Sequence, residues 1–206
     1  MSNRSVSIIR SISRVPRLWS STIAAHRQEV RDSILDAAGA IVSERSLLSV
    51  TMSEIALRSG VGRATLYRYF PDVEAILLTW HEREVAGHLE RLASIREQDG
   101  DAVDRLEALL GAYAVLAYQS RAGHDVATVV ATYRHPHVTR AHGEVVAMIH
   151  DLVEEATAGG RVRTDVSPAE LARYCIHAVG AARNLRSRAA VGRLVMVTVD
   201  GLRPRS

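Results

Sequence analysis

Residues 51–70 read TMSEIALRSGVGRATLYRYF, and this stretch most constrains the fold because it holds two short helical segments around a glycine pair. Thr51 with Glu54 three residues later is a capping-box pattern, which predicts a helix start. Gly60 ends that helix after about two turns, since glycine readily adopts the left-handed conformation of a helix terminus. A second short helix is predicted over residues 63–70. Two short helices joined by so tight a turn predict a helix-turn-helix.

The apolar residues of this stretch predict how the two helices pack. Ile55, Val61 and Leu66 have the spacing to bury the inner faces, and Ala56 is small where the helices would cross. The remaining positions carry groups that suit DNA, because arginine donates to guanine or phosphate and tyrosine hydroxyls suit phosphate oxygens. The pattern alone also fits an ordinary helical hairpin with solvated arginines. The expected outward residues are Arg63, Ala64, Thr65, Arg68 and Tyr69, with Tyr67 near the edge.

The rest of the chain after residue 28 also has helical periodicity. Apolar stripes predict helices over about 29–43, 72–97, 102–121, 125–133, 137–157, after residue 167, and over 189–202. Ser167 and Glu170 form a second capping box, with Pro168 at the first helical position, where its missing N–H has no cost. The only β-like run, VMVTV, lies within a helical context. We therefore predict an all-α fold of about nine helices.

Charge is unevenly distributed along the chain. The net charge is +3, and all 26 basic residues are arginine. Residues 1–28 contain five arginines and no acid, which suggests a polyanion or an acidic surface as a partner. Three interpretations of this segment stay open: a mostly disordered arm or upstream sequence, a basic arm that touches DNA, and a membrane-surface or targeting segment. No apolar run approaches the ~18 residues of a membrane span.

The remaining reactive side chains do not predict an enzyme or a metal site. The single cysteine, Cys175, lies in the helical run LARYCIHAV, which favours a buried thiol over a nucleophile and fits a reducing cytosol. His135, His137, His142 and His150 are spaced by 2, 5 and 8 residues around a proline, unlike converging zinc ligands, so a solvated turn is the simpler interpretation. We predict no catalytic residue, no metal and no cofactor; a small all-α enzyme using these groups is the rival hypothesis.

The longer stretch SVTMSEIALRSGVGRATLYRYFPDVEAIL resembles the N-terminal signature of the tetracycline-repressor (TetR) family of bacterial regulators. The resemblance rests on T-x-x-x-I-A, on G-V at the turn, on T-L-Y-x-Y-F and on x-x-E-A-I-L, and it covers residues 29 to about 80. Two positions depart from the family pattern. Val73 stands where members commonly carry a phosphate-binding lysine, and Gly62 replaces a frequent serine, which weakens the cap of the second short helix.

The resemblance implies a helix-turn-helix DNA-binding domain over residues 29–71 and a ligand-binding and dimerisation domain over residues 72–206, after the basic flexible arm of residues 1–28. It implies a cytoplasmic, ligand-responsive transcriptional regulator, most often a repressor. Such a protein binds palindromic operator DNA as a homodimer and is released by a small apolar effector.

The resemblance also carries residue roles onto this sequence. The DNA-binding surface would comprise Thr51, Ser53, Arg58, Gly62, Arg63, Ala64, Thr65, Tyr67, Arg68 and Tyr69. Effector-cavity candidates, each of which also fits a plain core position, are Trp80, Tyr113, Tyr118 and Tyr133. The last two helices would form the dimer interface, with candidate residues Cys175, Val179, Ala182, Val191, Leu194 and Val195.

Overall fold

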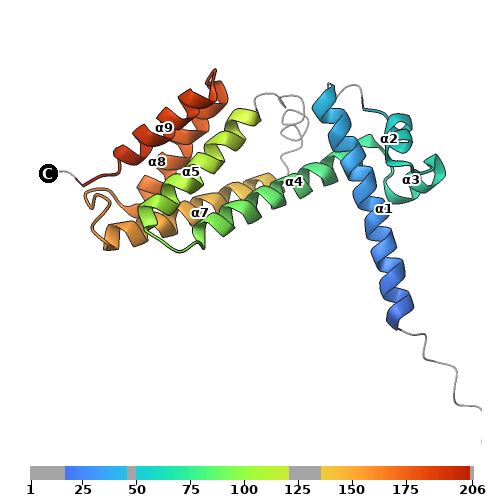
Figure 1. Cartoon of the computed structure of the whole chain (residues 1–206), viewed down its shortest axis with the longest axis horizontal. Helices are drawn as coiled ribbons and strands as arrows, with labels where there is room; N and C mark the ends of the chain where they lie inside the picture. Colours follow the sequence, from blue (N-terminus) through green and yellow to red (C-terminus); the bar gives the residue numbers. More distant parts are fainter. Residues whose placement is uncertain (1–16, 46–49, 121–135, 205–206) are drawn as a thin grey trace, which may run out of the picture. The chain divides into compact units, whose positions relative to one another are not determined.

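The computed structural model describes residues 17–45, 50–120 and 136–204, and their side chains from residue 23 onward. These residues contain eight α-helices, one short 3-10 helix and no strand, which confirms the all-α prediction. No helix within these ranges is long and apolar enough to cross a membrane. The chain divides into two compact units, Met1–Leu77 and Leu78–Ser206, which are described in turn (Figure 1).

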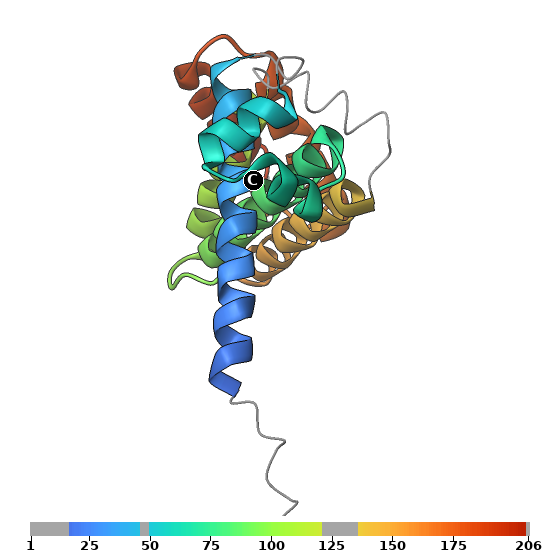
Figure 2. The same ribbon diagram turned by 90° about the vertical axis from the view of Figure 1, so that its right-hand side faces the viewer.

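The first unit contains α1 (Arg17–Glu44), α2 (Met52–Ser59), α3 (Arg63–Tyr69) and the start of α4 (Val73–Arg96). Helix α2 packs against α1, and α3 packs against α2 (Figure 2). Each helix contributes branched apolar side chains to one core, because its apolar residues recur at helical spacing. The fully buried residues of this core include Ile34, Ala38, Ile41, Ile55, Leu66 and Ile76.

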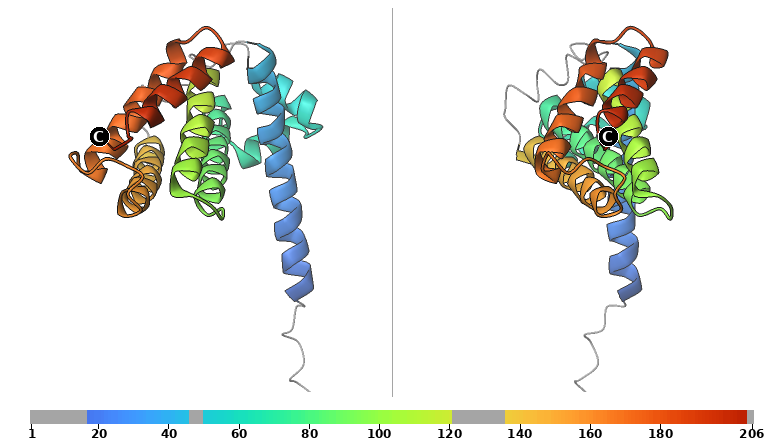
Figure 3. Two further views of the ribbon diagram at one scale, coloured as in Figure 1. Left: turned by 60° about the vertical axis from the view of Figure 1, so that its left-hand side comes forward. Right: turned by 90° about the vertical axis from the view of Figure 1, so that its left-hand side faces the viewer.

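Helix α1 is longer than the sequence periodicity predicts. It begins at Arg17, directly after Pro16, so residues 17–28 of the expected flexible arm are helical. Apolar periodicity marks only the part of a helix that packs on a core, and residues 23–29 are all exposed. Figure 3 shows this half of α1 extending beyond α2 and α3. The rest of the expected arm, residues 1–16, lies outside the described residues.

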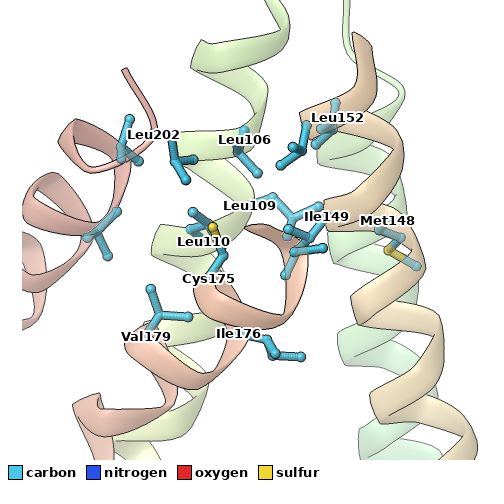
Figure 4. Close-up of a cluster of buried hydrophobic side chains, with 14 of the residues drawn as sticks. Leu106, Leu109, Leu110, Met148, Ile149, Leu152, Cys175, Ile176, Val179 and Leu202 are labelled. Atoms are coloured by element: carbon cyan, nitrogen blue, oxygen red, sulfur yellow. The ribbon is translucent and has the colours of Figure 1, made fainter. Parts of the chain in front are cut away.

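The second unit contains the remainder of α4, α5 (Ala102–Gln119), α7 (Pro136–Ala158), α8 (Pro168–Gly180), the 3-10 helix η2 (Ala181–Asn184) and α9 (Arg188–Asp200). Helix α5 packs against α7, α8, η2 and α9 and is the centre of this unit. Figure 4 shows its leucines pointing into a cluster with side chains of α7 and α8. The labelled members are Leu106, Leu109, Leu110, Met148, Ile149, Leu152, Cys175, Ile176, Val179 and Leu202. The helix expected over 125–133 lies outside the described residues.

The capping box predicted at the start of α8 forms completely. The Ser167 hydroxyl accepts a hydrogen bond from the Glu170 N–H at 3.3 Å, and the Glu170 carboxylate accepts one from the Ser167 N–H at 3.2 Å. Pro168 occupies the first helical turn, as predicted. The pKa of Glu170 is lowered because its carboxylate accepts hydrogen bonds from the hydroxyl and from the N–H of Ser167.

Candidate nucleic-acid interface

The start of α2 is held by a cap and by ion pairs rather than by a complete capping box. The Thr51 hydroxyl accepts a hydrogen bond from the Glu54 N–H at 3.2 Å, as predicted. The Glu54 carboxylate points elsewhere, with Oε1 lying 3.0 Å from Nη1 of Arg45 and 3.9 Å from Nε of Arg58. Thr51 supplies the cap, whereas Arg45 and Arg58 determine where the Glu54 side chain lies.

Arg58, a predicted DNA-binding residue, forms a two-bond ion pair with Glu44 at the end of α1. Its Nη1 and Nη2 donate to the two carboxylate oxygens at 2.7 and 2.5 Å. The Arg58 hydrogen bond holds the pKa of Glu44 below its usual value. A carboxylate at a helix C-terminus is unfavourable by itself, and the guanidinium offsets it while joining α1 to α2. Arg58 thus forms an ion pair that links α1 to α2. A DNA phosphate would have to compete with the Glu44 carboxylate for the Arg58 guanidinium.

The turn after α2 has the geometry that its glycine predicts. Gly60 has φ +69°, a left-handed conformation that is costly for residues with a Cβ. The end of α2 is tied to α1 because the Ser33 hydroxyl donates to the Ser59 carbonyl at 3.1 Å. Gly62 then occupies the N-cap of α3 with φ −59°, and no side chain caps this helix. Gly62 therefore leaves the start of α3 without a side-chain cap, as the sequence predicts.

Helix α3 is anchored along one side only. Leu66 is its single buried residue and is fully buried. Phe70, which follows the helix, is also buried, and the Arg31 guanidinium lies 4.7 Å from the centre of its ring. This cation–π contact links α1 to the end of α3. A helix of seven residues is unstable alone, so this packing holds its outer face in place.

The outer face of α3 carries most of the predicted DNA-binding side chains. Arg63, Ala64, Tyr67 and Arg68 are exposed, while Thr65 and Tyr69 are half-buried. Tyr67 is 50% exposed, so it faces outward more fully than the edge position expected for it. Tyr69 was expected to face outward and is half-buried. Thr51 and Ser53 are exposed at the start of α2. An exposed helix face with guanidinium and phenol groups can donate hydrogen bonds to phosphates and base edges.

The start of α4 has an acidic rather than a basic character. Asp72 accepts a hydrogen bond from the Ala75 N–H at 2.8 Å through Oδ1 and caps the helix. Val73 follows as the first helical residue and is half-buried. A carboxylate and an apolar side chain leave this terminus without the cation that family members commonly place there.

The predicted effector residues lie on two helices of the second unit. Trp80 on α4 and Tyr113 and Tyr118 on α5 are half-buried, and the two tyrosines pack against the core; Tyr133 lies outside the described residues. Burial raises the pKa of Tyr113, and the nearby charge of Arg183 opposes this. A groove of about 590 Å³ in this unit lies elsewhere, between α5 and the end of α9, and none of these aromatic residues lines it.

Most of the residues predicted for the dimer interface are buried within the second unit. Cys175, Val179 and Ala182 are fully buried, and Val191 and Val195 are 3% and 5% exposed. Leu194 is half-buried against the same core. They pack against the chain's own helices, and their part in a dimer interface stays a prediction.

Other residues of α8 and α9 form the exposed apolar face. Tyr174, Met196 and Val197 are 46%, 56% and 64% exposed. Tyr174 lies next to the buried Cys175, and Met196 and Val197 lie between the buried Val195 and Thr198. Apolar periodicity marks the apolar residues of a helix, but it does not tell whether the chain's own core or a partner covers them.

The histidines of the 135–150 segment have separate neighbours rather than a shared centre. His137 Nδ1 lies 3.5 Å from Glu82, His150 Nδ1 lies 3.7 Å from Asp151, and the His142 ring lies 6.5 Å from that of His177. Among the described residues, no three His, Cys, Asp or Glu side chains converge as metal ligands would. His135 lies outside the described residues.

Taken together, a glycine turn, an anchored short helix and an exposed arginine- and tyrosine-bearing face define a helix-turn-helix protein of the DNA-binding class. Residues 34–79 match the family of bacterial regulatory proteins called the tetR family, and residues 113–204 match the C-terminal domain of SbtR-like transcriptional regulators. The chain belongs to the TetR family of transcriptional regulators.

Similar proteins agree with this assignment. The chain is 40% identical over 90 residues to the uncharacterized HTH-type transcriptional regulator Rv1255c of Mycobacterium tuberculosis; the match covers 43% of each protein, so the chain spans less than half the length of this relative. It resembles the structure of the TetR regulator SCO0520 from Streptomyces coelicolor at 25% identity and a TM-score of 0.62, covering 85% of this chain and 99% of that one. A TetR/AcrR-family regulator from Thermobifida fusca shares the fold at 20% identity and a TM-score of 0.67, over 84% and 98% of the two chains.

Proposed function

We propose that the chain is a cytoplasmic, ligand-responsive repressor that binds palindromic operator DNA as a homodimer and is released by a small effector. One observation carries the proposal: α3 buries only Leu66 and exposes Arg63, Tyr67 and Arg68 along its opposite face. A recognition helix needs this combination, because it must be fixed to its domain on one side and present donors to the major groove on the other.

A dimer would place two recognition helices about 34–36 Å apart, which matches successive major grooves on one face of DNA. Helix α4 begins in the first unit and continues into the second, so it can couple an effector site to the spacing of the recognition helices. An effector that favours the DNA-incompetent spacing by ~3 kcal/mol weakens operator binding more than a hundredfold.

Substitutions of Tyr67 test the DNA-binding face. Operator fragments are first selected from genomic DNA with the wild-type protein. We expect Tyr67→Ala to weaken operator binding roughly 10–100-fold, because a hydrogen bond to a charged phosphate contributes ~1.5–3 kcal/mol. Tyr67→Phe separates the hydroxyl from the ring, and it should show most of the same loss. Unchanged affinity of both variants, with unchanged circular dichroism and melting temperature, would exclude this face.

The dimer would form through the exposed apolar face of α8 and α9. Tyr174, Met196 and Val197 are large apolar side chains in solvent, and Ala189 and Gly192 beside them would allow close approach of a second helix pair. Sedimentation should show a dimer for the wild type and a monomer for Met196→Glu/Val197→Glu. Leu57→Glu is the matched control, since Leu57 is an 81% exposed apolar residue on α2. A double variant that stays dimeric would exclude this face.

The effector site is proposed to include Trp80, Tyr113 and Tyr118. A structural neighbour of the same fold, at 19% identity and a TM-score of 0.58, is the SmeT–triclosan complex, which supports an apolar ligand. Trp19→Phe leaves Trp80 as the single tryptophan, so its fluorescence reports on the site. With triclosan as the probe, we expect saturable quenching and weaker operator binding. Quenching without any effect on DNA would argue against the regulatory role of this site.

A further inference from the structure

A groove of about 500 Å³ lies in the first unit beside the recognition helix. It is lined by Ile23, Ala24, Arg27, Gln28 and Arg31 of α1 and by Tyr69, the last residue of α3. The predicted DNA-binding surface did not include these α1 residues, although a basic arm that touches DNA was one interpretation of residues 1–28. The groove is formed because α1 continues past the core of its unit, and two of its arginines and one tyrosine line the same space.

The side chains that line this groove include two arginines and no carboxylate. Arg27 is exposed and forms no ion pair with any carboxylate within the described ranges, in contrast to Arg58. Arg31 stacks on Phe70, and this contact orients the guanidinium without neutralising it. The next two carboxylates after Arg27 on the same helix do not line the groove: that of Glu29 lies 3.7 Å from Nδ1 of His26, and that of Asp32 accepts two hydrogen bonds from Gln28 at 3.1 and 3.2 Å.

We propose that this groove, centred on Arg27 and Arg31, binds the DNA phosphate backbone next to the segment contacted by α3, and so widens the footprint of each protomer. The inference rests on the proposed DNA-binding function. Backbone phosphates lie on both sides of a recognition helix that occupies the DNA major groove. A phosphate bound by the Tyr69 hydroxyl would also lie close to Arg27 and Arg31, because all three side chains line the same groove of the protein. The preceding residues 1–26 contain four further arginines and no acid, so this segment is also positively charged.

An arginine that binds a backbone phosphate contributes affinity and carries no base information. Removing one such arginine should reduce the slope of log affinity against log salt by about 0.9, hence by about 2 for a dimer on two half-sites. Operator and unrelated duplexes should bind more weakly by a similar factor, about tenfold at low salt, because both have the same backbone.

The test compares Arg27→Ala with Arg91→Ala, which removes the same charge from an exposed position of α4 in the second unit. Binding to the selected operator and to an unrelated duplex of equal length is measured over a range of salt concentrations. We expect a smaller salt slope and a uniform loss of affinity for Arg27→Ala, no change for Arg91→Ala, and an intermediate result for Arg27→Lys. Arg31 is replaced only by lysine, because its contact with Phe70 also supports the fold.

Three outcomes would overturn the proposal, and they are distinguishable. An unchanged salt slope for Arg27→Ala, with normal operator binding by the wild type, refutes this inference alone. A change in sedimentation of Arg27→Ala without DNA would show that the groove instead holds protein, either a second copy or another segment of the chain. Failure of the wild type to bind any duplex would refute the proposed function and this inference with it.

Discussion

The N-cap of the recognition helix is a position where a side chain can be added without disturbing the fold. Gly62 caps α3 with φ −59° and ψ 143°, a conformation that serine adopts without strain. A Cβ placed there would have no heavy atom within 4 Å. We therefore predict that Gly62→Ser stabilises α3, because its hydroxyl can accept a hydrogen bond from the backbone of the first turn.

The magnitude follows from comparing serine with alanine at this position. Both substitutions remove the extra freedom of glycine from the unfolded chain, which stabilises by roughly 0.4–1 kcal/mol. Serine also caps the helix, and a serine N-cap is worth ~1 kcal/mol over alanine. Alanine is a poorer cap than glycine, so Gly62→Ala should be close to neutral. The difference between the two variants, about 1 kcal/mol, isolates the cap.

Amide hydrogen exchange of the DNA-free protein measures the difference in α3 stability between Gly62→Ser and Gly62→Ala. The Leu66 N–H donates to the Gly62 carbonyl at 2.9 Å, so its exchange reports opening of α3. A stabilisation of about 1 kcal/mol should slow its exchange about fivefold in Gly62→Ser relative to Gly62→Ala. Equal exchange in the two variants would refute the reasoning, since it would mean that α3 is held entirely by the packing of Leu66 and gains nothing from a cap.

Gly60→Ala should destabilise the first unit by about 1–2 kcal/mol in urea denaturation, because its φ of +69° is left-handed. Cys175 should resist alkylation at pH 8 until the protein unfolds, since burial raises the pKa of its thiol to about 12. The Arg58 hydrogen bond lowers the pKa of Glu44 in the folded state, so the stability it contributes is present above the usual value of 4.5 and is lost as pH falls below it. Glu44→Gln should accordingly have a lower melting temperature than the wild type at neutral pH, and the two melting temperatures should converge in acid.

Local sequence predicted the helix-turn-helix well because its determinants are local. The cap at Thr51, the left-handed Gly60 and the missing cap at Gly62 each depend on residues within four positions along the chain. The buried positions of Ile55 and Leu66 also followed from spacing, because a two-turn helix that must pack on one side has few alternatives.

Long-range contacts explain what the sequence could not predict. The sequence predicted that Arg58 binds DNA. In the structure Arg58 pairs with Glu44, which lies 14 residues away and could not be identified as its partner from local sequence. Helix α9 has both buried and exposed valines, and which of Val195 and Val197 is exposed depends on how α9 packs against α5. Residues 23–29 of α1 are exposed, so the apolar stripe that packs on the core did not extend to them.

The positions of the basic side chains determine where the protein would bind the phosphate backbone of DNA. Family members commonly place a lysine at the start of α4, whereas this chain has Val73 there, directly after the carboxylate of Asp72. A phosphate approaching that terminus would meet a negative charge that already accepts the Ala75 N–H. The guanidinium of Arg27 lies instead on α1, on the groove that Tyr69 shares. We therefore expect Val73→Lys to recover less affinity than Arg27→Ala removes, because Asp72 repels the phosphate that a new lysine would bind, while no carboxylate lines the described groove at Arg27.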